Sequence, residues 1–248
     1  MLESLSYQVN SPSDLDETVS PSSAITSLAT GLSAAELAPL SLADHAYQQL
    51  RDKLIMLDIR PGDPINDGLL AAELQIGRTP IREALKRLES DHLVVSYARR
   101  GTFATIVDIT ELADVSEIRE LLEPLAARRA ARMSTAPMRE QLREVAETIA
   151  SIGSAPVNQR ELMRYDITTH RLIYRAAANR HLEDVLVRYD NLATRIWCLV
   201  LDKIPSMSGH ITEHVQLLEA IADGDSDLAA QLSLAHVTNF EAAIRDVL

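Results

Sequence analysis

Residues 77–88 read Gly77-Arg78-Thr79-Pro80-Ile81-Arg82-Glu83-Ala84-Leu85-Lys86-Arg87-Leu88 and contain the clearest structural signal in the chain. Thr79 is a favourable N-cap, and Pro80 suits the first helical position because its missing N–H costs nothing there. Apolar residues then recur at positions i, i+3, i+4 and i+7, which predicts an amphipathic helix with one buried stripe. The residues of this stripe are Ile81, Ala84, Leu85 and Leu88.

The other side of this helix is basic. Arg82 and Lys86 lie there, and Arg78 is close to the helix start. Positive charge at the outward, N-terminal positions of a short helix is what reading the major groove of DNA requires. From this helix alone, the alternative is an ordinary amphipathic helix whose basic face is solvated.

The flanking segments favour the DNA-reading interpretation. Upstream, apolar spacing from Leu42 to Leu57 predicts a helix, and residues 68–75 fit a second, shorter one. Downstream, residues 93–97 and 102–107 predict two strands joined by Ala98-Arg99-Arg100-Gly101, a turn with two cations and a glycine suited to positive φ. Three helices and a basic-tipped hairpin predict a winged helix-turn-helix whose wing lies against phosphates or reaches into the minor groove.

The charge distribution is compatible with local DNA contact. The net charge of −12, spread evenly, would argue against nucleic-acid binding. Residues 1–40 carry five acids and no base, however, and residues 108–248 carry twenty-two acids and fifteen bases. Between Arg78 and Arg100 there are six bases and three acids. The acidic excess therefore lies outside the predicted DNA-reading segment.

Composition also suggests compartment and domain organisation. The single cysteine, Cys198, excludes an intramolecular disulfide and suits a reducing cytoplasm. The apolar run at residues 196–201 is too short to cross a membrane, and no secretory signal pattern begins the chain. Residues 1–40 are rich in Ser, Pro, Thr and acids, which predicts a disordered arm. We expect a DNA-binding domain over residues 41–107 and a helical domain over residues 108–248.

Helical periodicity replaces strand signals after residue 107. The pattern predicts an antiparallel all-α bundle and therefore a chain that is mostly α. Pro124 is expected to bend the first of these helices. The six predicted helices cover residues 108–133, 137–152, 158–178, 181–203, 211–222 and 227–247.

Several polar residues fall within the apolar stripes of these helices. Asp166 and His170 are i, i+4 neighbours on one helix, and His214 and His236 lie on two others. Three imidazoles and a carboxylate suit Zn²⁺, and also Ni²⁺, Mn²⁺ or Fe²⁺ if waters complete an octahedron. The alternative is that each is a satisfied polar residue of the core. His210 also points inward and pairs with His214, so spacing alone does not choose between the two i, i+4 pairs.

Two arginines are candidates for binding an anionic ligand near these groups. Arg119 falls on the inward face of its helix, where its guanidinium would form a fork for a carboxylate. An ion pair with Glu123 or with a neighbouring helix is the alternative. Arg195, at the flank of its apolar stripe, is the second candidate.

The N-terminal half resembles the GntR family of bacterial transcription regulators. The similar segments are Pro61-Gly62, Ala71 to Leu74, Arg78 to Leu85, Arg87 to Glu89 and Gly101 to Phe103. The resemblance implies DNA contacts by Arg78, Thr79 and Arg82 and by the wing around Arg100 and Gly101, to which the charges of Lys86 and Arg99 would add.

Two positions depart from the family pattern. Gly77 stands where the family usually has serine, which removes a capping hydroxyl worth about 1 kcal/mol. Gly68 stands where some members have an arginine that contacts DNA.

The helical half resembles the FCD ligand-binding domain of the FadR-like branch of that family. The resemblance implies a metal held by Asp166, His170, His214 and His236, without His210, and a small carboxylate effector beside it. The similar segments are residues 118–126, Asp166 to His170, Asn179, Glu213-His214, Ala220-Ile221, Gly224-Asp225 and His236.

These features together predict a cytoplasmic regulator that binds a palindromic operator as a homodimer and responds to a small organic or sugar acid. Repression released by ligand is the default expectation, with no catalytic residue and no membrane partner. One alternative is a metal-dependent hydrolase, which would need an open metal position and a separate acid or base. The other is a constitutive DNA binder whose metal is purely structural.

Overall fold

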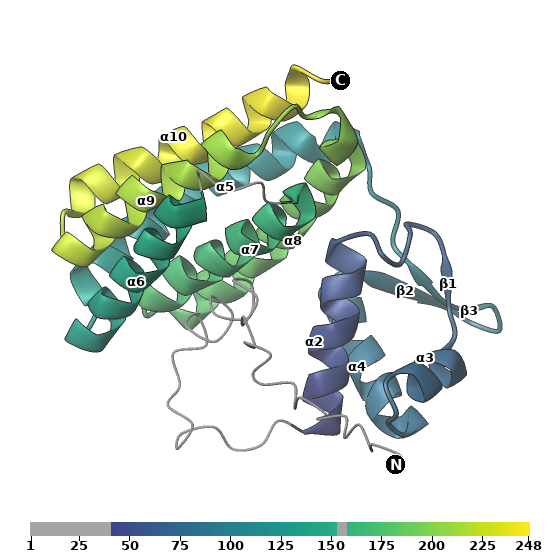
Figure 1. Cartoon of the computed structure of the whole chain (residues 1–248). Helices are drawn as coiled ribbons and strands as arrows, with labels where there is room; N and C mark the ends of the chain where they lie inside the picture. Colours follow the sequence, from purple (N-terminus) through teal and green to yellow (C-terminus); the bar gives the residue numbers. More distant parts are fainter. Residues whose placement is uncertain (1–40, 153–157) are drawn as a thin grey trace, which may run out of the picture.

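The computed structural model describes residues 41–152 and 158–248. These residues form a small winged-helix body and a larger bundle of long helices (Figure 1). The prediction of a mostly α chain, with a winged helix-turn-helix before an all-α bundle, is confirmed. The predicted arm over residues 1–40 and the break at residues 153–157 lie outside the described residues.

The winged-helix body contains an antiparallel sheet with strand order β1-β3-β2. Val95 pairs with Phe103, and Pro64 of the added strand β1 pairs with the other side of Phe103. Strand β1 was not predicted from the sequence, because its two residues are too few to show the alternation of apolar and polar side chains. The elements are α2 (Leu42–Ile55), β1 (Pro64–Ile65), α3 (Asp67–Glu73), α4 (Arg78–Ser90), β2 (Val94–Tyr97) and β3 (Gly101–Ala104).

Helix α4 begins earlier than the sequence indicated. Gly77 is the N-cap in an extended conformation and makes no side-chain capping bond, so the prediction of Thr79 as N-cap was wrong. Pro80 is tolerated at the third position of the helix because the first four N–H groups of any helix have no partner within it. The predicted apolar stripe is confirmed, and its four residues are buried.

The larger body contains six α-helices among the described residues, as predicted, with ends shifted by a few positions. Asn158, Asn179 and Asp225 accept capping hydrogen bonds, and Gly224 ends α9 with a φ of 83°. The helices are α5 (Leu112–Met133), α6 (Ala136–Ile152), α7 (Gln159–Ala176), α8 (Arg180–Val200), α9 (Ser208–Asp223) and α10 (Ser226–Arg245). Short 3₁₀ turns, η1 (Ile109–Glu111) and η2 (Leu201–Lys203), precede α5 and follow α8.

Helix α5 is central to the bundle. It packs against α7, α8, α9 and α10, and α6 covers α9 from the other side (Figure 1). Helix α2 of the winged-helix body packs against α8, and the buried apolar residues of both bodies join in one core. Among the described residues, no helix combines the length and apolar character that a membrane crossing requires.

Two polar contacts connect the bundle to the winged-helix body. Both terminal nitrogens of Arg195 in α8 donate to Thr105, to its hydroxyl and to its carbonyl oxygen, at 2.7 Å each. Thr105 directly follows β3, the strand that carries the wing. Arg160 at the start of α7 forms an ion pair with Asp58, just beyond α2. Movement of α7 or α8 would therefore act directly on the winged-helix body.

Arg139 of α6 satisfies carbonyl groups at two helix ends. Its Nη2 donates to the Ala131 carbonyl at 2.8 Å and its Nε to the Ser134 carbonyl at 3.2 Å, at the end of α5. Its Nη1 donates to the Ala222 carbonyl at the end of α9. The last carbonyls of a helix have no partner within it, so one guanidinium joins the ends of two helices.

We expect Arg139→Met to lower the free energy of unfolding by about 2–4 kcal/mol, because the Ala131 and Ser134 carbonyls lose this charged donor and the Ala222 carbonyl keeps only Arg143 Nη2 at 3.4 Å. Urea titrations followed by circular dichroism would measure the change in midpoint. Arg180→Met, at an exposed position of α8, is the matched control. Equal midpoints for the two variants would contradict this role.

Candidate DNA interface and metal centre

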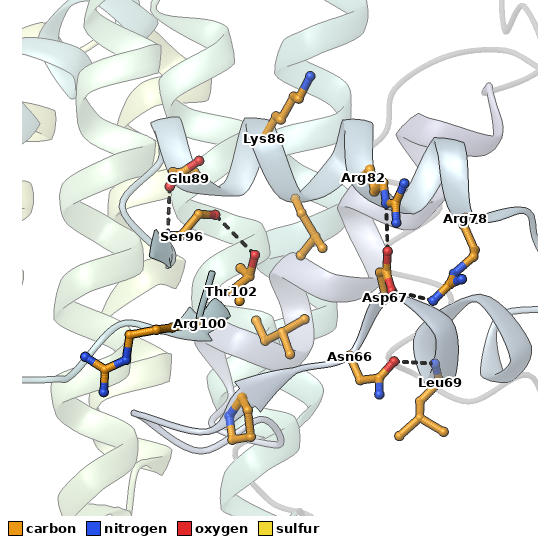
Figure 2. A pocket seen from close by; sticks show the side chains of 14 residues that line it. Asn66, Asp67, Leu69, Arg78, Arg82, Lys86, Glu89, Ser96, Arg100 and Thr102 are labelled. Carbon is orange, nitrogen blue, oxygen red and sulfur yellow. Dashed lines mark hydrogen bonds and ion pairs between the residues drawn. The ribbon is translucent and has the colours of Figure 1, made fainter. Parts of the chain in front are cut away.

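A basic groove lies between α4 and the wing. Arg78, Arg82 and Lys86 line it from α4, and Arg100 lines it from the turn between β2 and β3 (Figure 2). All four side chains are exposed. Thr79 is also exposed on the first turn of α4. Five of the seven positions predicted to contact DNA therefore line one groove, Gly101 among them, whereas Thr79 and Arg99 do not line it.

Asp67 organises two of these arginines. Its carboxylate accepts from Arg82 Nε at 2.7 Å and from Arg78 Nη2 at 3.0 Å (Figure 2). The hydrogen bond from Arg82 is the main cause of the lowered pKa of Asp67. Gly68 leaves room for this arrangement, since a Cβ there would lie 3.0 Å from Arg78 Nη2. Asp67 thus orients both guanidinium groups and must be displaced where a phosphate or base takes its place.

The wing is tied to α4 through its strands. The backbone N–H of Ser96 donates to Glu89 near the end of α4 at 2.8 Å, and the hydroxyls of Ser96 and Thr102 lie 3.1 Å apart (Figure 2). Gly101 has a φ of 98°, as its place in the turn predicted, and exposed Arg99 has a φ of 63°. The wing therefore presents its arginines from a turn whose strands are held against α4.

Four predicted metal ligands meet inside the bundle. Asp166 and His170 of α7, His214 of α9 and His236 of α10 offer ligand atoms that all lie within 4.8 Å of one another, and all four are buried. Nε2 of His170 lies 3.2 Å from Nε2 of His236 and 3.4 Å from Nε2 of His214. Oδ1 of Asp166 lies 3.7–3.8 Å from the same three nitrogens. The four side chains therefore surround one point from three helices.

The far side of each imidazole faces an acceptor. This arrangement favours the tautomer that carries its proton on Nδ1 and leaves Nε2 toward the centre, as in metal sites whose outer hydrogen bonds orient the ligands. The Nδ1 contacts are His170 to Glu123 Oε2 at 3.1 Å, His214 to the Ile211 carbonyl at 3.2 Å, and His236 to Glu213 Oε2 at 2.9 Å.

The protonation states at this centre suit a cation. Burial would raise the pKa of Asp166, but His170, His210 and His214 hold it well below its ordinary value. Burial lowers the pKa of His214 to about 3 and that of His236 far below its usual range, so both offer free lone pairs at neutral pH. His170 keeps a proton, because Glu123 and Asp166 outweigh burial and raise its pKa to about 9, and a bound ion would displace that proton.

The donor set fits a divalent metal ion. Asp166 Oδ1 is buried and makes only contacts of 3.4–3.8 Å with ring nitrogens and no hydrogen bond among the described residues, although the large majority of buried polar atoms have one. With metal–ligand bonds of about 2.1 Å, neighbouring donors lie about 3.0–3.8 Å apart for angles between 90° and 130°. The distances among the four side chains fall in that range.

Comparison with known proteins agrees with both halves of this description. Residues 42–104 match the family of bacterial regulatory proteins of the gntR type, and residues 114–239 match the FCD domain. The chain belongs to the GntR family. It is a transcription regulator whose helix-turn-helix precedes an FCD domain.

Individual relatives support the same family. The chain is 29% identical to the Nta operon transcriptional regulator of Aminobacter aminovorans over 72% of its own length and 82% of that protein. It is 21% identical to the transcriptional repressor RspR of Escherichia coli, over 81% of its own length and 88% of that protein. The solved structure of E. coli McbR/YncC has the same fold, with a TM-score of 0.73 at 21% identity, over 84% of this chain and 99% of that one.

The two arginines predicted to bind an effector have different surroundings in this GntR protein. Arg119 is buried, and its Nε donates to Glu123 at 2.5 Å, which is the ion pair considered as the alternative. Arg119 and His170 outweigh burial and lower the pKa of Glu123 to about 2. Arg195 is buried against Thr105, between the two bodies. Effector contact by either arginine stays a prediction.

Three acidic residues of these sites were absent from the predicted set. Asp67 is 11 and 15 positions from its arginine partners, and Glu213 is 23 positions from His236, so no local spacing links them. Glu123 was visible only as an i, i+4 partner of Arg119, since its contact with His170 joins α5 to α7. Periodicity reports the face on which a residue lies, and these contacts depend on which helices are neighbours.

We expect Arg82→Ala to weaken specific DNA binding by about 1–3 kcal/mol and to leave the fold intact, because the side chain is exposed in the groove and its guanidinium can pair with a base or phosphate. A gel-shift titration on an operator selected from random duplexes would measure the change. Arg180→Ala, on the exposed face of α8, is the control for loss of one positive charge. Unchanged operator affinity would remove Arg82 from the interface.

We expect His214→Ala to lower both the bound metal and the melting temperature, because it removes one of four converging donors and leaves a cavity in the core. Elemental analysis and thermal unfolding, each with and without added chelator, would test this. His181→Ala, at an exposed position, is the matched control. If variant and parent contain equal metal, the ligand set is wrong.

Proposed function

We propose that this GntR regulator is a homodimeric repressor that releases a palindromic operator when a small carboxylate binds beside a metal ion in the bundle. The observation that carries the proposal is the buried cluster of Asp166 with three imidazoles, in a chain whose first body has a basic groove. A purely structural bundle would not need a buried carboxylate whose Oδ1 makes no hydrogen bond and faces several ring nitrogens. The relative RspR of Escherichia coli is a transcriptional repressor, which agrees with repression by this chain.

Asp166, His170, His214 and His236 would hold the ion. A divalent ion there supplies a Lewis-acidic position at which an oxygen of a carboxylate can bind. The buried Arg119 is one residue removed from these ligands, because Glu123 contacts both the Arg119 guanidinium and the ring of His170. Displacement of Glu123 by a ligand carboxylate would free Arg119 to bind that ligand.

The contacts between the two bodies suggest how the bundle would control the DNA-binding groove. Helix α7 carries Asp166 and His170 near its middle. At the start of the same helix, Arg160 forms an ion pair with Asp58, just beyond α2. Helix α8 packs on α7 and holds Thr105 at the base of the wing through Arg195. A shift of α7 or α8 on ligand binding would therefore move or loosen the winged-helix body, by no more free energy than the ligand's preference for one arrangement.

Dimerisation is proposed from the symmetry of operator recognition and from one apolar face. A helix-turn-helix dimer places its two recognition helices in major grooves one turn apart. Leu121 and Leu125 of α5 are 67% and 44% exposed, one helical turn apart, and Val185 of α8 is 41% exposed. Exposed apolar side chains of this size on a central helix fit burial against a second copy of the chain.

The experiment is an anisotropy titration of a selected operator with a panel of carboxylic and sugar acids. It uses metal-loaded protein, chelator-treated protein and His214→Ala. The proposal expects at least one acid to weaken operator binding at least fivefold, only with metal present. If no acid changes operator affinity, the protein is a constitutive binder and the proposal fails. Turnover of an ester, amide or phosphate by the metal-loaded protein would instead support the hydrolase alternative.

We expect Arg195→Met to reduce the ratio between operator affinities with and without the active acid, because it removes both hydrogen bonds to Thr105. Operator binding without acid should persist, since Arg195 does not line the basic groove. The same anisotropy titration measures the ratio. Arg188→Met, at an exposed position of the same helix, should leave it unchanged. A full acid response in Arg195→Met would contradict this route of coupling.

A further inference from the structure

His210 has the surroundings of the metal-binding histidines although it lies outside their set. It is one turn before His214 on α9, and its Nε2 lies 3.4 Å from Oδ1 of Asp166. The corresponding distances from His170, His214 and His236 to the same oxygen are 3.7–3.8 Å. Four ring nitrogens therefore face one carboxylate oxygen, and that of His210 is the nearest.

Beyond their mutual contact at 3.4 Å, the two atoms of this closest pair have no partner among the described residues. Nε2 of His210 and Oδ1 of Asp166 are buried and make no hydrogen bond to any described residue, and the His210 side chain is 8% exposed. A buried imidazole nitrogen without a partner costs free energy unless an ion or another donor or acceptor completes it. The pair points to a shared ligand in the space that both atoms face.

The ring of His210 is fixed in the orientation that such a ligand requires. It stacks on His236, with centroids 4.1 Å apart and planes at 20°, and on Trp197, with centroids 4.9 Å apart and planes at 28°. Its Nδ1 lies 3.7 Å from Glu213, the carboxylate that also accepts from His236. His210 therefore has its Nε2 toward Asp166, as the other three histidines do, but its Nδ1 is too far from Glu213 for a hydrogen bond.

We propose that His210 is a fifth protein ligand of the metal ion and binds it through Nε2. This inference rests on the proposed metal centre and extends it. His210 forms a second close group with Glu213 and His236, and it lies outside the four-residue group whose ligand atoms are all within 4.8 Å of one another, so its ring must move toward the centre to bind the same ion.

A fifth donor changes which metal the protein prefers. Structural zinc sites take four protein ligands in a tetrahedron, whereas Ni²⁺, Mn²⁺ and Fe²⁺ accept six. Four imidazoles and a carboxylate leave one position of an octahedron for a single oxygen of an effector or a water. The inference therefore predicts a site that favours six-coordinate ions more strongly than a set of four donors would.

The test compares purified full-length parent, His210→Gln, His214→Gln and His181→Gln. Chelator competition would give the dissociation constants for Ni²⁺ and Zn²⁺, and Co²⁺ absorption would report coordination number, since four-coordinate Co²⁺ absorbs visible light much more strongly than six-coordinate Co²⁺. We expect His210→Gln to weaken Ni²⁺ binding about tenfold or more, to weaken Zn²⁺ binding less, and to change the Co²⁺ spectrum. Exposed His181→Gln should match the parent in all three measurements.

The outcomes separate this inference from the proposed function. Parent-like Ni²⁺ affinity and Co²⁺ spectrum in His210→Gln, with loss of binding in His214→Gln, would overturn the role of His210 and leave the four-residue site standing. Absence of metal binding in the parent would overturn both. If His210→Gln does not fold, X-ray absorption of the Ni²⁺-loaded parent decides, because four coordinated imidazoles are expected and three would contradict the inference.

Discussion

The buried carboxylate of Asp166 is the group on which the organisation of the bundle depends. It is 3% exposed, and one of its oxygens faces ring nitrogens from three helices without a hydrogen bond. An ionised carboxylate in an apolar core is very costly unless a cation or several donors compensate it. The surrounding imidazoles are held by outer acceptors, so their inner nitrogens point at the same place. These features make the cluster a candidate cation-binding centre.

The centre joins helices that are distant in sequence. Ligand atoms come from α7, α9 and α10, and Glu123 of α5 supports the ring of His170. A bound ion would therefore connect four of the six bundle helices and contribute its binding free energy to the folded state. Helix α7 also reaches the winged-helix body through Arg160, so the packing around Asp166 and the placement of the basic groove share one helix.

In the basic groove, too, one acidic side chain positions the groups around it. Asp67 holds Arg78 and Arg82 in place, within a chain whose net charge is −12. An acidic protein can still present a cationic surface when its bases are local, because exposed charges farther away than about 8 Å are screened at physiological salt. The carboxylate also lowers the tendency of the groove to bind any polyanion, since a phosphate must first replace it.

Sequence periodicity alone determined the helical class, the buried stripe of α4 and the inward direction of Asp166, His170, His210, His214 and His236, because burial repeats with the helical turn. Periodicity could not show that Asp67 lies against Arg82, that Glu213 supports His236, or that Arg195 faces Thr105, since these pairs are far apart along the chain. It misplaced the N-cap of α4 because Thr79 and Gly77 are both acceptable caps locally. Only tertiary packing selects which inward faces meet, and therefore which polar groups share a site.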